Sequence, residues 1–125
     1  GNFQDGLPNL VFVYSRLENL EEIPEDYFTG GYMIDVLEHI YPKDRSKMFN
    51  ALRRVLKNGS YFMIDTPYLK AYYDGLSHVD FFDVQKIINI VNENGFILVE
   101  VKRDQRIDGH EEKHNRLNVL IRNKK

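Results

Sequence analysis

Two short apolar runs, separated by one amphipathic segment, dominate the pattern in the middle of the chain. Residues 32–34 begin the first run, and residues 60–64 form the second. Between them a helix is predicted to begin at Pro42. Its apolar residues recur at spacings of three and four, which places them on one face. These residues are Met48, Leu52, Val55 and Leu56. Asn58-Gly59 is a typical helix stop, since glycine adopts a left-handed backbone at little cost. The pattern predicts a βαβ unit, and so two parallel strands.

A strand and an acidic loop are predicted before this unit. Residues 10–14 (LVFVY) are rich in β-branched and aromatic side chains, as strands are. Residues 15–26 carry five acidic side chains and predict a solvated loop with at most one helical turn.

A second helix and two strands are predicted after the unit. Asp80 or Asp83 is a candidate N-cap, and Asn94-Gly95 is the stop signal. The predicted buried stripe of this helix is Val84, Ile87, Ile88 and Val91. Residues 96–101 then predict a strand, and the alternation over residues 117–121 predicts a last strand with one buried face. The charged connection between these two strands favours an antiparallel pair.

Polar residues follow both strands of the βαβ unit. The first run stops at Asp35, Glu38 and His39, and the second ends in Asp65-Thr66-Pro67-Tyr68. In open parallel sheets, ligands bind beyond the carboxyl ends of the strands. The sequence therefore predicts a ligand site at this edge of the sheet.

Composition narrows the class of protein. The chain has 125 residues, 42% apolar and 29% charged, which predicts one α/β domain of ordinary globular type. A net charge of −2 without a basic stripe argues against nucleic-acid binding. The absence of cysteine excludes disulfides and zinc–thiolate sites. No apolar run reaches the ~20 residues that span a bilayer, so we expect no membrane contact and a cytoplasmic location.

Several segments together resemble the class I S-adenosylmethionine-dependent methyltransferases. DVLEHI is followed by LRRVLKNG and an apolar strand that ends in TPY, and then by HVDFF, a helix and Asn-Gly-Phe. Their order and spacing are similar to the carboxy-terminal half of that family. The resemblance implies a partial Rossmann-like sheet, mainly parallel with an antiparallel last strand, and S-adenosylmethionine as the cofactor.

The family's glycine-rich turn after its first strand has no counterpart here, since no GxGxG occurs in the chain. The chain resembles a methyltransferase without its first two strands, and we expect a fragment of a longer protein. Residues 10–14 would pair directly with residues 32–34, or another chain would supply a partner. The alternative in which another chain pairs with these residues predicts a strand partner or a homo-oligomer.

The resemblance also implies site residues. Met33, Ile34 and Asp35, where the fourth family strand ends, would lie beside the methionine portion of the cofactor. Arg16 occupies the position at which the family often has an acidic residue near the adenine, and the backbone N–H of Leu17 would contact the adenine ring.

His39 and His78 are the candidate bases for methyl transfer to a small-molecule acceptor, because histidine titrates near neutral pH. Tyr68 and Tyr72 are the candidate acceptor-pocket residues. Each has a structural alternative: a hydrogen bond that closes a loop for His39, a cap of the following helix for His78, and core packing for the tyrosines.

His110-Glu111-Glu112-Lys113-His114 matches the HExxH zinc-protease pattern. A glycine precedes it, a strand is predicted to begin by Arg116, and no third ligand follows, so we interpret it as a charged hairpin loop and expect no metal. The leading functional hypothesis is methyl transfer within a longer chain. The alternative is a non-catalytic methyltransferase-like module for interaction or regulation.

Overall fold

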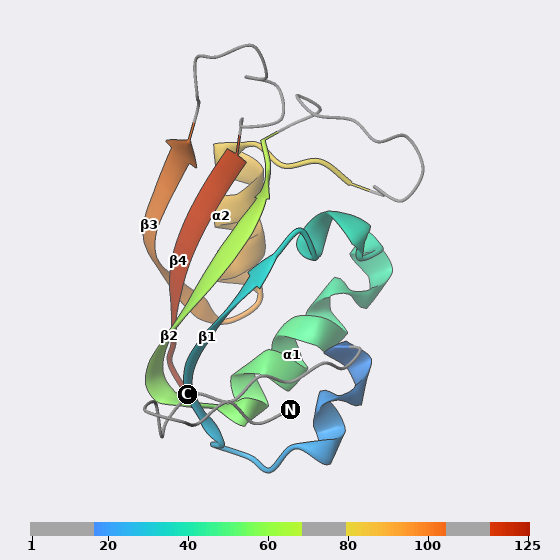
Figure 1. Cartoon of the computed structure of the whole chain (residues 1–125), viewed down its shortest axis with the longest axis vertical. Coiled ribbons are helices and arrows are strands. Elements are labelled where there is room, and N and C mark those ends of the chain that lie inside the picture. The colour runs from blue at the N-terminus through green and yellow to red at the C-terminus, as the bar shows by residue number, and fades with distance from the viewer. Residues whose placement is uncertain (1–16, 69–79, 105–115) are drawn as a thin grey trace, which may run out of the picture.

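A computed structural model describes residues 17–68, 80–104 and 116–125 of the chain (Figure 1). The strands are β1 (Phe28–Ile34), β2 (Leu56–Pro67), β3 (Phe96–Asp104) and β4 (Arg116–Asn123). The helices are α1 (Arg45–Val55) and α2 (Val84–Glu93), with short 3-10 helices η1 (Leu17–Glu22), η2 (Leu37–His39) and η3 (Pro42–Asp44).

The four strands form one sheet in the order β1-β2-β4-β3. β1 pairs parallel with β2, and β4 pairs antiparallel with both β2 and β3. Three strands therefore run in one direction and the last strand runs in the other. This confirms the predicted βαβ unit and the antiparallel last strand.

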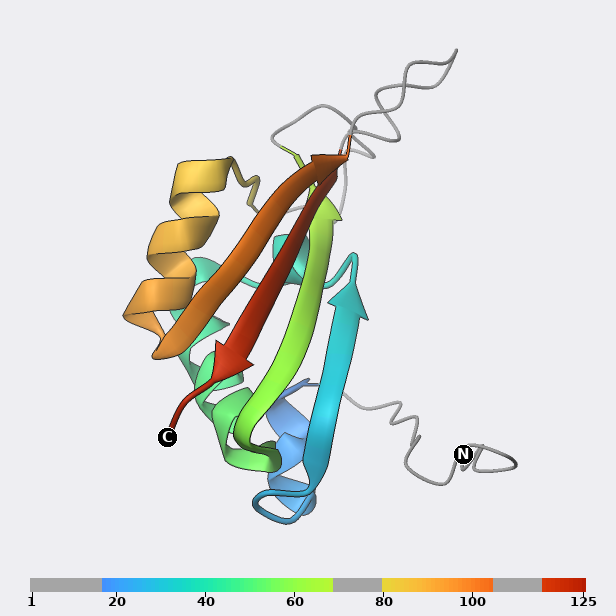
Figure 2. The ribbon, with the colours of Figure 1, turned by 90° about the vertical axis from the view of Figure 1, so that its left-hand side faces the viewer.

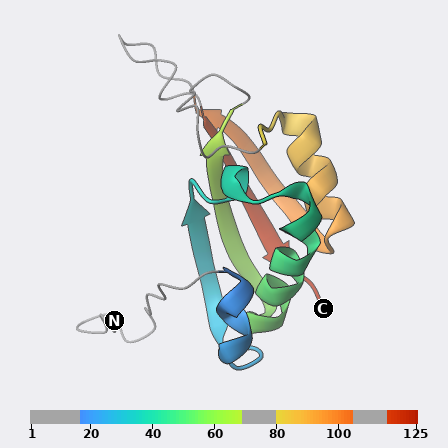
Figure 3. The same ribbon diagram turned by 90° about the vertical axis from the view of Figure 1, so that its right-hand side faces the viewer.

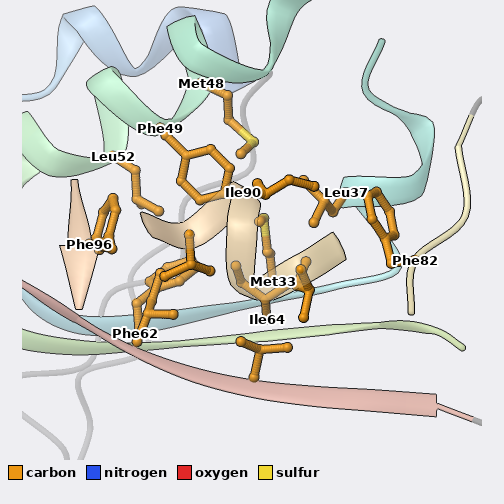
Figure 4. Packing of buried hydrophobic residues seen from close by; sticks show 14 of the residues in the cluster. Met33, Leu37, Met48, Phe49, Leu52, Phe62, Ile64, Phe82, Ile90 and Phe96 are labelled. Carbon is orange, nitrogen blue, oxygen red and sulfur yellow. The ribbon is translucent and has the colours of Figure 1, made fainter. Parts of the chain in front are cut away.

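Both α-helices pack on the same face of the sheet (Figures 2 and 3). The hydrophobic core lies between the sheet and these helices, and Figure 4 shows side chains of α1 above those of the strands. Phe49 of α1 contacts Phe96 edge-on, with 5.8 Å between the ring centroids. Ile64 of β2 and Phe82, before α2, are fully buried in the same cluster.

The start of the first helix matches the sequence pattern, but its end does not. Pro42 opens η3, and α1 follows directly. Asn58-Gly59 was expected to stop the helix, yet α1 ends at Val55 and β2 begins at Leu56. Gly59, with φ of 84°, lies within β2 where the pairing with β1 shifts register. The left-handed glycine thus serves a strand irregularity, which absorbs the extra residues.

The second helix confirms Asp83 as its N-cap, since the Asp83 carboxylate accepts a hydrogen bond of 2.7 Å from the backbone N–H of Lys86. The helix ends before Asn94-Gly95, and Gly95 has φ of 80°, as its stop signal requires. The predicted stripe was partly wrong: Val84 is exposed, and Ile90 is buried.

Residues 10–14, the first predicted strand, lie outside the described residues, as does the HExxH segment. None of the helices that the structure describes combines the length and the apolar character needed to cross a membrane.

Candidate functional site

Polar side chains gather where β1 and β2 end, at the carboxyl edge of the parallel pair. Asp35 follows β1, and Asp65 lies directly beside it near the end of β2, where the Asp35 N–H donates to the Asp65 carbonyl at 3.0 Å. η2 follows β1 and carries Glu38 and His39. Because the chain turns over the strand ends here, residues that are far apart in the sequence share one small region.

The first part of this region is an ion-pair cluster of Asp35, Asp65 and Arg116. Arg116 begins β4, which runs in the opposite direction, so its side chain reaches the carboxyl ends of its neighbours. Its guanidinium donates to Asp65 through Nε at 2.5 Å and also pairs with Asp35. Burial acts to lower the pKa of Arg116, but the hydrogen bonds that it donates to both carboxylates outweigh burial, so this pKa lies above its usual value. Within this cluster, one cation faces two carboxylates.

Asp35 is also unusual in its backbone. Its φ is 57°, in the left-handed region that non-glycine residues rarely adopt. This conformation turns the chain out of β1, and the Asp35 side chain stays about half exposed. The exposed carboxylate is therefore presented to solvent at the strand end, while its partner Asp65 is mostly covered.

The second part of the region is built around Glu38. Its side chain is only 1% exposed. Glu38 Oε1 accepts a hydrogen bond of 3.1 Å from the buried Thr66 hydroxyl, and Oε2 lies 3.7 Å from His39 Nε2. Burial is the main reason why the pKa of Glu38 lies above its usual value. A buried carboxylate therefore faces an imidazole that is about one-third exposed.

Neighbouring segments fix this arrangement in place. The backbone N–H of Asp80 donates to the Glu38 carbonyl at 3.3 Å. Tyr68 and Phe82 form a short parallel bridge, so the chain returns to the same edge after residues 69–79. The guanidinium of Arg103 stacks over the Tyr68 ring at 3.9 Å.

The structure places some of the predicted site residues together and others apart. Asp35 and His39 both lie at the carboxyl edge. Tyr68 lies at the end of β2 and packs against the core. The Met33 side chain is buried in the core, whereas Ile34 is exposed on the other face of the sheet. Three of the predicted site residues lie outside the described residues: Arg16, Tyr72 and His78. For Leu17, only the backbone, which lies in η1, is described.

Sequence reasoning assigned no role to Glu38, Thr66 or Arg116. Glu38 and Thr66 belong to the two polar segments that follow the strands, so their position gave a signal. Arg116 gave none, because its pairing with Asp35 joins residues 81 positions apart. Among the described residues, no group of three or more metal-ligating side chains gathers closely enough to hold a metal ion.

S-adenosylmethionine carries an ammonium group, a sulfonium and a carboxylate, and the carboxylates of Asp35 and Asp65 suit its two cationic groups. The described glycines offer no cradle for the adenosine portion. Gly30 and Gly31 lie inside β1, and a side chain at Gly31 would meet the Phe62 ring at 2.9 Å. These glycines permit close strand packing. The described residues therefore fit the methionine end of the cofactor and supply no glycine-rich turn.

Comparisons with solved structures identify the fold. A SAM-dependent methyltransferase from Archaeoglobus fulgidus superimposes with a TM-score of 0.70 at 17% identity, over 88% of this chain and 66% of its own length. One from Methanosarcina mazei gives a TM-score of 0.67 at 14% identity, over 88% and 65%.

The 1,6-didemethyltoxoflavin-N1-methyltransferase of Burkholderia thailandensis, solved with 1,6-didemethyltoxoflavin and S-adenosylhomocysteine, gives a TM-score of 0.71 at 16% identity. The alignment covers 91% of this chain and 51% of that enzyme. This chain thus spans about half to two-thirds of the length of the solved structures that it matches.

A search of curated proteins finds no match. The family model of a methyltransferase domain matches residues 2–64, which is half of the chain. That match ends within β2 and includes β1, η2 and α1, and so it covers Asp35, Glu38 and His39 of the carboxyl edge. Sequence and fold therefore agree, and the chain belongs to the class I methyltransferase family, whose cofactor is S-adenosylmethionine.

Proposed function

We propose that this chain forms one wall of the active site of a methyltransferase that methylates a small-molecule acceptor. The observation that carries the proposal is the carboxyl edge, where Asp35 and His39 follow the same strand in a chain of methyltransferase fold. Ligands of such sheets bind at this edge. The proposal extends to a longer polypeptide, because the adenosine cradle is not made by the described residues.

In this proposal, Asp35 accepts hydrogen bonds from the ammonium group of the methionine portion. S-adenosylmethionine would supply an electrophilic methyl group, whose bond to the positively charged sulfur breaks in the transfer and leaves neutral S-adenosylhomocysteine. His39 would take the proton from the acceptor's hydroxyl or amine, so that the acceptor's oxygen or nitrogen has a lone pair for the methyl carbon. The other proposed roles are unchanged. On the adenine side they belong to Arg16 and Leu17, and at the strand end to Met33 and Ile34. On the acceptor side they belong to His78, Tyr72 and Tyr68.

Isothermal titration calorimetry of the chain with S-adenosylmethionine tests cofactor binding directly. We expect measurable binding, and we expect Asp35→Asn to weaken it about 10-fold, or ~1.4 kcal/mol, because a charged acceptor is lost. Asp26→Asn serves as the control, since Asp26 is an exposed carboxylate whose Oδ1 pairs with Lys125 at 2.5 Å, remote from the edge. Absence of heat and of thermal stabilisation at millimolar cofactor would refute cofactor binding by this chain.

A second candidate function is supported by the missing glycine-rich motif, since no GxGxG occurs in the 125 residues. In that reading, the domain serves interaction or regulation and does not bind the cofactor by itself. Binding in the same titration would exclude this second candidate, because it holds that the domain does not bind the cofactor by itself.

A further inference from the structure

Glu38 is the one fully buried acidic side chain among the described residues. Its carboxylate is held on one side only: Thr66 donates to Oε1 at 3.1 Å, and Oε2 makes no hydrogen bond within the described part of the chain. A buried charge without such a bond is costly, so this oxygen needs a physical explanation. The ionisable group described beside it is the His39 imidazole, whose Nε2 lies 3.7 Å from Oε2.

Other charged groups around Glu38 do not supply this partner. Asp35, at the end of β1, repels the Glu38 carboxylate and pairs with Arg116. Asp80, which packs against η2 through its backbone, has its carboxylate bound to Arg45 and Lys86. Arg116, Arg45 and Lys86 are therefore bound to other carboxylates, Arg103 lies over the Tyr68 ring, and His39 is the group that faces Glu38.

The backbone around Glu38 is also constrained. Its carbonyl accepts the Asp80 N–H, and the N–H groups of His39 and Ile40 close the turn of η2 onto Val36 and Leu37. The main chain and Oε1 are thus both held by hydrogen bonds, while Oε2 lies 3.7 Å from His39 Nε2. A fixed carboxylate beside an imidazole is the usual means of orienting a histidine that accepts a proton.

We infer that Glu38 is a positioning residue for His39: anchored by Thr66, it fixes the orientation of the imidazole and stabilises its protonated form. This inference rests on the proposed function for its purpose, namely that His39 holds the proton taken from the acceptor. The chain Thr66–Glu38–His39 then links the end of β2 to the exposed face of the imidazole.

The test is an NMR titration of the His39 ring in the wild-type chain and in Glu38→Gln. The glutamine side chain keeps the volume and an oxygen for the Thr66 hydroxyl, but it removes the charge. We expect the midpoint of the His39 titration to fall by about 0.5 to 2 pH units, as loss of a close carboxylate predicts. His39→Gln assigns the signal among the four histidines.

Asp35→Asn is the matched control, because Asp35 is a nearby carboxylate that is half exposed and bound by Arg116. It should move the His39 midpoint less than Glu38→Gln does. An unchanged midpoint in Glu38→Gln would overturn the inference, and so would an equal shift in both variants.

A second measurement covers the case in which Glu38→Gln does not fold. In the wild-type chain, the NMR chemical shift of the Glu38 carboxyl carbon should show an inflection at the pH where His39 titrates. A chemical shift that does not change at that pH would contradict the inference. Neither readout involves the cofactor, so a failed calorimetric titration leaves this result standing, and the reverse also holds.

Discussion

The two faces of the sheet differ in what covers them. On one face, α1 and α2 bury Met33, Phe62 and Ile64 in a continuous core (Figure 4). On the opposite face, no described helix covers the sheet (Figure 2). Several large apolar side chains on that face are well exposed: Tyr32, Ile34, Tyr61, Ile97 and Val99.

This difference is informative because β1 and β2 are apolar on both faces. Tyr32-Met33-Ile34 and Tyr61-Phe62-Met63-Ile64 are nearly continuous apolar runs, which are typical of parallel strands covered on both sides. By contrast, the apolar residues of β4 alternate with polar ones, as in a strand with one solvated face. The apolar sequences of β1 and β2 are typical of strands that are covered on both faces, but the described residues cover only one of these faces.

The largest expected effect comes from the covered face. Ile64 is fully buried, and Ile64→Thr should lower the free energy of unfolding by about 2 to 4 kcal/mol, because it removes packed methyl groups and buries an unpartnered hydroxyl. Urea denaturation followed by circular dichroism measures this change. A loss below about 1 kcal/mol would be inconsistent with the core as described.

An intermediate loss of stability is expected when Asp80 loses its charge, because its ion pairs hold the segment before α2 over this same face of the sheet. Asp80 accepts from Arg45 of α1 at 2.5 Å and from Lys86 of α2, and both cations also lie over the Phe82 ring. Burial acts to raise the pKa of Asp80, but hydrogen bonds from Lys86, Arg45 and the Phe81 N–H outweigh it and hold the pKa below 3.8. Asp80→Asn should therefore cost about 2 kcal/mol at pH 7.

The sign of the pH dependence follows from this lowered pKa. The stabilisation is fully present above the unfolded value of 3.8 and is lost as the pH falls through the lower, folded value. Unfolding curves of wild type and Asp80→Asn should thus converge in acid. Asp26→Asn, in the exposed pair with Lys125, is the matched control and should change stability by less than about 0.5 kcal/mol. A difference between wild type and Asp80→Asn that stays constant with pH would contradict this account.

Local patterns predicted the elements, while contacts between distant residues escaped them. The Asp83 cap, the Asn94-Gly95 stop and the alternation in β4 are local signals, and the structure confirms each. The Asn58-Gly59 signal failed because the same left-handed glycine serves a helix end or a strand irregularity, and the pairing with β1 decides between them.

The candidate site divides in the same way. Asp35 and His39 were predicted from the polar stop after an apolar run. Arg116 was not, since its role depends on β4 running antiparallel beside β2, which places its first residue at the end of β1 and β2. Thr66 and Glu38 are 28 residues apart and meet only because the βαβ unit brings both to one edge.

The smallest expected effect comes from the open face. Ile34 is 51% exposed and lies in β1 beside the strand that carries Ile64, so Ile34→Thr is the same substitution on the opposite face. Threonine keeps the β-branched shape, and the free energy of unfolding should change by no more than about 0.5 kcal/mol. The measurement is the same urea denaturation, with both variants run in parallel. A cost that approaches that of Ile64→Thr would show that this face is covered in solution, and the contrast between the two faces would then no longer hold.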